Sequence, residues 1–355
     1  MGDSALLLRK QRTVFIQFTV MKKLLVIISL AIAAAVGLPA ASWQPDILGS
    51  GYEMRYVDQG RDYSGDVRST IIRKKSDCGG HKGVLYIHGY NDYFFQKDMA
   101  DRFADSCINF YAVDLRKYGR SITEGQHLFQ VRDLKEYFAD IDSALAQMHA
   151  DGIDTIALMG HSTGGLISAY YLSENPDSPV KALLLNSPFL DWNFNGFMRK
   201  VAIPAFGALG RLFPDLAISQ GDGTGYQESL LKKHHGEWNY NQDWKLFHPQ
   251  KVDASWTRAI SSAQNKIKKG AGIRVPILLM HSDKSVDGDH WTPEFQHADA
   301  VLNVKDISRI GRKLGQDVTE DTIRGGLHDL VLSSPPVREQ VYNYIFSWLR
   351  QKHIF

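Results

Sequence analysis

The 355-residue chain has the composition of an ordinary globular protein, with 44% hydrophobic and 23% charged residues. Its formal net charge is +2, but residues 1–41 alone carry +4, so the rest of the chain carries −2 and is slightly acidic. We therefore expect no basic surface for nucleic acid, and the length allows one large domain or two modest ones.

The N-terminal segment has the pattern of an export signal. Two lysines follow Met21, and an apolar run over 24–36 leads to small residues around Ala40 and Ala41. A charged region, a hydrophobic region and a cleavage site occur in this order in signal peptides. We expect cleavage near Ala40 or Ala41 and export to the periplasm or beyond; an uncleaved anchor is the alternative.

The chain contains two cysteines, and their positions fit an exported protein. Cys78 and Cys107 each precede a predicted strand, over 83–88 and 109–114. If these strands are parallel neighbours, both cysteines lie at the same end of the sheet. A disulfide is then expected in an oxidising compartment, and two separate buried thiols are the alternative.

Most of the chain alternates strands and helices, which predicts a mostly parallel sheet with helices on both faces. The chain opens with an expected antiparallel hairpin. The predicted strands are 52–57, 67–74, 83–88, 109–114, 153–159, 180–186, 275–280 and 300–307, and the predicted helices are 96–106, 131–148 and 337–350.

This alternation breaks from Phe189 to about Gly270. The stretch is rich in aromatic residues, then polar, and has no clear period. We interpret it as a cap over the carboxyl edge of the sheet, where binding loops and lids belong. The predicted organisation is an upstream extension with an incorrectly assigned start (1–20), a signal peptide (21–41), a first core part (42–188), the cap (189–272) and a second core part (273–355).

One motif indicates a catalytic nucleophile. An apolar strand runs into Gly160-His161-Ser162-Thr163-Gly164, and a helical sequence follows at once. In this setting the G-x-S-x-G pattern holds a serine on a strained turn with its hydroxyl exposed. The helix start directs free N–H groups toward the oxyanion that would form. Ser162 is therefore the predicted nucleophile.

A serine needs a general base, usually a histidine oriented by a carboxylate. His328 lies in a glycine-rich loop before the last predicted helix, and it is the predicted base. Asp283, just after the strand over 275–280, is the favoured acid, with Asp287 and Asp299 as alternatives.

The remaining site predictions concern the oxyanion and possible cofactors. The predicted oxyanion donors are the backbone N–H groups of Thr163 and of Tyr90, which follows the glycine turn at Gly89. The acidic loop over 283–290 lacks the spacing of a calcium loop, so no metal is expected, and no other cofactor is needed.

Together these residues resemble the α/β-hydrolase superfamily, and within it the monoacylglycerol lipase, lysophospholipase and serine-aminopeptidase-like group. The resemblance rests on motifs at residues 87–90, 113–121, 160–165, 186–189 and 326–329. It implies the α/β-hydrolase fold with an inserted cap, and hydrolysis of carboxylic esters through an acyl-enzyme.

The chain departs from this group in one place. Counting without gaps from Pro276, Ser285 stands where related enzymes usually have the catalytic aspartate. The identity of the acid therefore stays open among the three aspartates named above.

The expected substrate is a lipid or other small ester, such as a monoacylglycerol, a lysophospholipid or a short-chain ester. The aromatic cap suggests an apolar acyl chain and a transient contact with a membrane surface. One alternative is an amidase or aminopeptidase, in which an acid such as Glu124 or Glu237 would bind the substrate ammonium. Another is a non-catalytic binding protein on the same scaffold.

Overall fold

The computed structural model describes residues 42–355. The predicted upstream extension and signal peptide lie outside the described residues. Within the described range, none of the helices combines the length and the apolar character that a membrane span requires.

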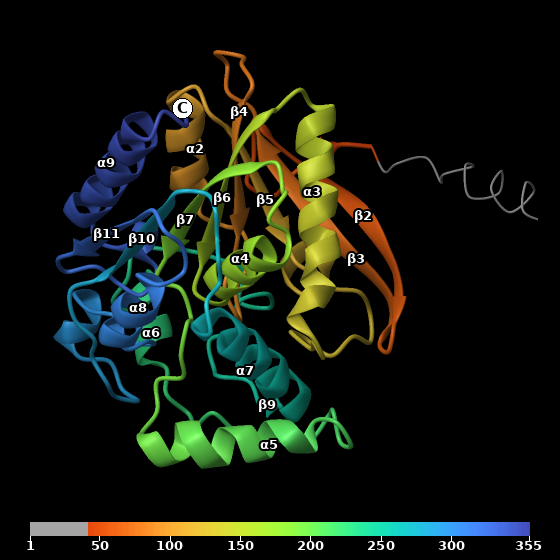
Figure 1. The fold of residues 1–355 in the computed structure, drawn as a ribbon, viewed down its shortest axis with the longest axis vertical. Helices are drawn as coiled ribbons and strands as arrows, with labels where there is room; N and C mark the ends of the chain where they lie inside the picture. Colours follow the sequence, from red (N-terminus) through yellow and green to blue (C-terminus); the bar gives the residue numbers. More distant parts are fainter. Residues whose placement is uncertain (1–41) are drawn as a thin grey trace, which may run out of the picture. The chain divides into compact units, whose positions relative to one another are not determined.

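A nine-stranded sheet forms the centre of the molecule, in the order β1-β2-β3-β5-β4-β6-β7-β10-β11 (Figure 1). The pairs from β5 to β11 are parallel, whereas β1–β2, β2–β3 and β3–β5 are antiparallel. The strands are β1 (Gln44–Pro45), β2 (Tyr52–Asp62), β3 (Gly65–Lys74), β4 (Lys82–Ile87), β5 (Asn109–Asp114), β6 (Thr155–His161), β7 (Val180–Asn186), β10 (Ile277–Ser282) and β11 (Val318–Ile323). The predicted mostly parallel sheet and its opening hairpin are confirmed.

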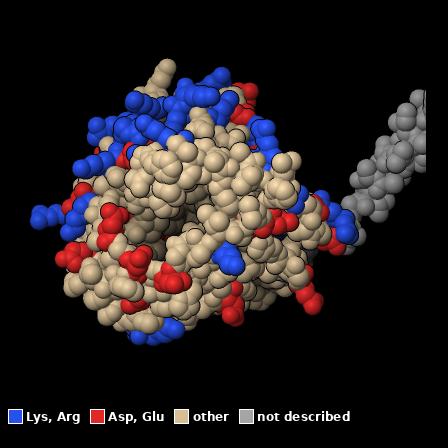
Figure 2. Space-filling model, turned by 90° about the horizontal axis from the view of Figure 1, so that it is seen from below, with Lys and Arg blue, Asp and Glu red and all other residues tan. Residues whose placement is uncertain are grey.

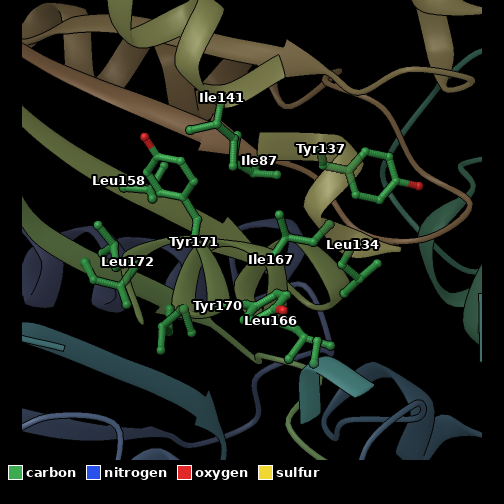
Figure 3. Close-up of a cluster of buried hydrophobic side chains, with 14 of the residues drawn as sticks. Ile87, Leu134, Tyr137, Ile141, Leu158, Leu166, Ile167, Tyr170, Tyr171 and Leu172 are labelled. Atoms are coloured by element: carbon green, nitrogen blue, oxygen red, sulfur yellow. The ribbon is translucent and has the colours of Figure 1, made fainter. Parts of the chain in front are cut away.

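Helices cover both faces of this sheet, which confirms the predicted layer arrangement. One apolar cluster joins one face of the sheet to α3 (Phe138–Ala150), α4 (Thr163–Glu174), α7 (Ala254–Lys268) and α8 (Val304–Gly311). Figure 3 shows part of it, with Ile141 of α3 and Tyr171 of α4 directed toward Ile87 and Leu158 of the sheet. The other cluster joins the opposite face to α2 (Lys97–Asp105) and α9 (Pro335–Gln351).

The end of the core differs from the prediction. Residues 300–307 do not form a strand, because α8 begins at Val304 with Asn303 as its N-cap. The last strand is β11, whose residues are mostly polar and only partly buried. It lies at the edge of the sheet and pairs only with β10. An edge strand needs few apolar residues, so its sequence carries a weak strand signal.

Short helices complete the core. The predicted helix over 131–148 begins as a 3₁₀ turn, η2 (Leu134–Tyr137), with a capping box at Asp133. The other short turns are η1 (Gly119–Ser121), η4 (Pro293–Gln296) and η5 (Leu330–Leu332).

The region between β7 and β10 consists of two differently packed parts. It contains η3 (Met198–Ala202), α5 (Ile203–Leu209), β8 (Ala217–Ile218), α6 (Gly225–Leu230), β9 (Val252–Asp253) and α7. In Figure 1, α5 lies across one end of the molecule, away from the sheet. In contrast, α7 packs against α4 and contributes to the core. The predicted cap over 189–272 therefore includes one helix of the core layer.

A disulfide joins Cys78 to Cys107. The two residues precede β4 and β5, which are parallel neighbours, so of the two alternatives that the sequence left open, the structure has the bridge and not two separate thiols. The bond therefore joins the segments that enter the amino ends of these two strands. Ser162 lies at the opposite end of the sheet, after the carboxyl end of β6.

Candidate active site

Ser162 lies on a sharp turn between β6 and α4, with a strained backbone. Its φ is +53° and its ψ is −118°, a conformation that costs a non-glycine residue about 1–3 kcal/mol. Two backbone hydrogen bonds hold the turn: Ser162 N–H donates to the Asn186 carbonyl (3.0 Å), and Phe189 N–H donates to the Ser162 carbonyl (2.9 Å). Backbone hydrogen bonds with β7 and with the residues that follow it therefore hold Ser162 in its strained conformation.

Close backbone packing explains the glycines of the motif. A Cβ on Gly164 would lie 2.2 Å from the Ile87 carbonyl oxygen, and a Cβ on Gly160 would lie 2.5 Å from the Gly164 carbonyl oxygen. Both distances are far below van der Waals contact. Only glycine therefore lets α4 start this close to β4 and β6.

His328 is paired with Asp299, and the prediction that Asp283 orients it is wrong for this geometry. His328 Nδ1 donates to Asp299 Oδ2 at 2.9 Å, and both side chains are buried. Asp283 is exposed and accepts from Gly325 N–H instead. Asp287 is also exposed. Asp299, which the sequence offered as an alternative acid, is thus the one that contacts His328.

The path of the chain after β10 explains this difference. Ser285, the residue at the family's usual acid position, forms a parallel bridge with Asp299. Between them the chain makes an excursion that contains η4, and it returns to the same place in space. The N–H groups of Val301 and Leu302 both donate to Asp299 Oδ1 at 2.8 Å. These bonds leave Oδ2 free for His328.

The loop that carries His328 is also connected to the serine turn. Asn186, whose carbonyl holds Ser162, donates through Nδ2 to Asp329 Oδ1 at 2.7 Å and accepts from Leu330 N–H at 3.2 Å. A single buried asparagine therefore fixes both catalytic loops relative to each other. In the sequence, nothing beyond the family resemblance distinguishes Asn186 and Asp329.

The predicted oxyanion donors lie beside Ser162. A Cβ on Gly89 would be 3.2 Å from Ser162 Cβ, so the loop after β4 passes directly over the serine. Within residues 42–355, the N–H groups of Tyr90 and Thr163 have no acceptor. Both residues line the same cavity as Ser162. Two unpaired backbone donors near a serine suit a developing oxyanion.

His88 orients one of these donors. Its Nε2 accepts from Leu115 N–H at 3.1 Å, so the proton is on Nδ1, which donates to the Gly89 carbonyl at 2.8 Å. In a trans peptide the C=O and N–H point in opposite directions. Holding the Gly89 carbonyl therefore aims the Tyr90 N–H away from His88.

Ser162 and His328 both line one cavity of about 440 Å³. Aromatic and aliphatic side chains form one group of lining residues, and polar side chains form a second. The apolar group is Phe189, Trp192, Phe194, Trp256, Val301 and Leu302, and the polar group includes Asn91, Asp92, Gln220, Gln227, Lys245 and Gln250. Figure 2, seen from the α5 end, shows a hollow in a largely uncharged part of this face.

Asp92, His161 and Asp329 form a buried cluster whose spacing could suit a metal, but protein groups already bind them. Asp92 pairs with Lys245, Asp329 accepts from Asn186 and Gln96, and His161 Nδ1 donates to the Asn186 carbonyl. Burial also lowers the pKa of His161, which favours its neutral form. The cluster is therefore a polar network behind the serine.

The model for the family described as "Serine aminopeptidase, S33" matches residues 80–335 of this chain. The chain belongs to this family. Membership of the S33 family agrees with the α/β-hydrolase fold, in which a nucleophile turn, a cap and a late histidine recur in this order.

Relatives of the S33-family chain include lipases from two bacteria. It is 28% identical to a monoacylglycerol lipase from Mycolicibacterium smegmatis over 57% of this chain and 69% of that protein. It is 23% identical to the phospholipase YtpA from Bacillus subtilis over 58% of this chain and 76% of that protein.

Solved structures support the fold. A soluble variant of monoglyceride lipase from Saccharomyces cerevisiae, in complex with a substrate analogue, is similar with a TM-score of 0.65 and 17% identity, covering 88% of this chain and 98% of that one. Monoacylglycerol lipase from Paleococcus ferrophilus has a TM-score of 0.59 and 19% identity, covering 81% and 99%.

The geometry around His328 predicts different effects for two aspartates. Replacing Asp299 by Asn should lower kcat by about 10³- to 10⁴-fold, because the amide favours the wrong histidine tautomer. Asp283→Asn, the matched control, should change kcat by less than about fivefold, because Asp283 contacts only the Gly325 backbone. Steady-state ester hydrolysis measures both. A large loss in Asp283→Asn with normal activity in Asp299→Asn would contradict this assignment.

Proposed function

We propose that this ester hydrolase of the α/β-hydrolase type cleaves monoacyl lipid esters through an acyl-enzyme on Ser162. The observation that carries the proposal is the buried His328–Asp299 pair, because its histidine lines the cavity that is also lined by the strained Ser162 and by Tyr90 and Thr163, whose N–H groups are unpaired within residues 42–355. Each group needed for acyl transfer is present in one site.

The reaction begins with attack of Ser162 Oγ on the ester carbonyl carbon. Because His328 Nδ1 donates to Asp299, Nε2 is the nitrogen that takes the serine proton. The N–H groups of Tyr90 and Thr163 stabilise the negative oxygen of the tetrahedral intermediate. Its collapse breaks the bond to the alcohol, which takes the proton from His328. Water then attacks the acyl-enzyme in the same way and releases the carboxylic acid.

The lining of the cavity favours an amphiphilic substrate. The apolar lining residues suit an acyl chain, and the polar ones suit a hydroxylated or otherwise polar headgroup. The two bacterial relatives are named as a monoacylglycerol lipase and a phospholipase, which agrees with esters of this kind. A monoacylglycerol or a lysophospholipid is therefore the proposed substrate class.

The two acids that the sequence offered for the aminopeptidase alternative, Glu124 and Glu237, do not lie at the cavity. A substrate ammonium would need a free carboxylate at the cavity. Glu237 pairs with Arg338, and neither Glu237 nor Glu124 belongs to the cavity lining. Two aspartates line the cavity: Asp92, which is paired with Lys245, and Asp289, which has no ion-pair partner within residues 42–355 and is the carboxylate that an aminoacyl substrate would use.

The proposed reaction is tested with p-nitrophenyl esters, from acetate to palmitate. The protein used begins at Ser42. Turnover is expected, and Ser162→Ala should lower kcat by about 10³-fold or more because the nucleophile is lost. Monooleoylglycerol and lysophosphatidylcholine then test the headgroup. Equal inactivity of wild type and variant on every ester, with cleavage of an aminoacyl anilide, would contradict an ester substrate.

We also propose that the cap contacts a lipid surface. Eight of the eleven large hydrophobic side chains exposed on the described residues lie between positions 194 and 218. We call these eight the apolar crest: Phe194, Phe197, Val201, Leu209, Leu212, Phe213, Leu216 and Ile218. Two exposed cations, Lys200 and Arg211, lie within the same stretch. An apolar surface with nearby cations suits the interface of an anionic membrane.

Sedimentation with anionic liposomes tests this contact. The triple variant Phe197→Ser/Leu212→Ser/Phe213→Ser should reduce the bound fraction at least fivefold, since each side chain loses on the order of 1 kcal/mol of transfer free energy. Ile47→Ser removes an equally exposed apolar residue outside the crest and serves as the control. Unchanged sedimentation of the triple variant would contradict a role for the crest.

A further inference from the structure

We infer that Lys245 is a positioning residue for ester hydrolysis, because it helps to hold the loop that presents the Tyr90 oxyanion donor. The inference rests on the proposed function. The loop in question spans residues 89–95, and the residues that hold it span 240–246, which we call the anchoring segment. This segment lies in the polar, aperiodic part of the predicted cap.

The anchoring segment contacts nearly every residue after Tyr90. Lys245 Nζ donates to Asp92 Oδ1 at 3.0 Å. The side chain of Asn91 makes two reciprocal bonds with the Leu246 backbone, of 2.9 Å and 2.7 Å. Asn91 also has a φ of +48°, a left-handed conformation that asparagine adopts more readily than most residues, and these two bonds hold its side chain there.

Further contacts continue along the loop. Asn241 N–H donates to the Tyr93 hydroxyl at 2.8 Å, and the Tyr93 ring packs edge-on against Trp244 at 5.2 Å between centroids. The Phe95 ring lies 5.1 Å from that of Tyr240. Residues about 150 positions later in the chain therefore hold four of the five loop positions after Tyr90, and the fifth, Phe94, donates its N–H to Asp114 of β5 instead.

The anchoring segment is itself attached to the core. Just before it, Trp238 Nε1 donates to the Leu332 carbonyl at 2.8 Å, and Glu237 pairs with Arg338 of α9 at 2.8 Å. Leu332 belongs to the turn that follows His328. The segment thus bridges the oxyanion loop and the region of the catalytic histidine.

The Lys245–Asp92 pair is the charged centre of these contacts. Its side chains are only 7% and 2% exposed. Removing one partner of such a pair leaves an uncompensated buried charge, which makes the remaining group seek new contacts. Asp92 is two residues from Tyr90, so its displacement would move the 89–90 peptide that His88 holds from the other side.

The position of the Tyr90 N–H matters most in the transition state. An oxyanion donor binds the developing negative oxygen more strongly than the ground-state carbonyl. Loss of Lys245 should therefore lower kcat and the affinity for a tetrahedral adduct together, while substrate binding changes little. A purely structural residue would lower stability without this pattern.

The test compares Lys245→Met with wild type and with Lys232→Met, an exposed lysine in the same part of the chain. Lys245 also lines the cavity, so the assay uses a p-nitrophenyl ester, which has no polar headgroup; on it Lys245→Met should reduce kcat about 10- to 100-fold with KM within about threefold, as expected for a displaced catalytic group. Affinity for an alkyl boronic acid, which forms a tetrahedral adduct with serine, should fall by a similar factor. Lys245→Arg should restore part of both losses, and Lys232→Met should match wild type.

The double variant Asp92→Asn/Lys245→Met removes both charges, so it keeps the test available if the single variant does not fold. It should lower kcat and boronic acid affinity together, but by less than the single variant, because the tie between the loop and the anchoring segment is lost while no unpaired charge remains. If wild type hydrolyses the ester and a folded Lys245 variant has a normal kcat, or differs from wild type only by a higher KM, the inference is overturned. Absence of wild-type turnover would instead contradict the proposed function.

Discussion

The strained backbone of Ser162 is the constraint on which the rest of the site depends. A non-glycine residue holds this conformation only when its surroundings determine it, and here β7 supplies the determining contacts. The Asn186 carbonyl accepts from Ser162, and the Asn186 side chain fixes the loop that carries His328. One asparagine at the end of a central strand thus couples Ser162 and His328, the proposed nucleophile and base.

The oxyanion side of the site is held from two directions. His88, at the end of β4, fixes the Gly89 carbonyl from inside the core. The anchoring segment holds Asn91 and Asp92 from outside, through the reciprocal amide bonds and the buried ion pair. The region inserted between β7 and β10 therefore includes an exposed part, the apolar crest, and a part that packs tightly on the catalytic core.

Local sequence patterns were sufficient for the core and for the serine turn. Parallel strands that are covered on both faces must be apolar, so β4 to β7 and β10 could be predicted, and the Gly-rich turn carries its own steric reason. β11 could not be predicted because an edge strand tolerates polar residues. Counting along the chain also failed for the acid, since residues 286–298 form an excursion that returns Asp299 to the position beside Ser285.

The anchoring segment shows a different limit of the sequence. Its residues have no helical or strand period because they follow the surface of the loop that they hold. The residues next to Lys245 in the sequence do not distinguish it from the exposed Lys232 and Lys233. Only the three-dimensional pairing with Asp92 separates a buried lysine from a solvated one.

Peptide mapping by mass spectrometry after treatment with an alkyl fluorophosphonate tests the central claim most directly. Such a reagent phosphonylates a serine only where a base and an oxyanion site activate it. The account predicts one modified residue, Ser162, and no modification in His328→Ala protein. Modification of another residue, or none in folded and ester-active protein, would contradict it.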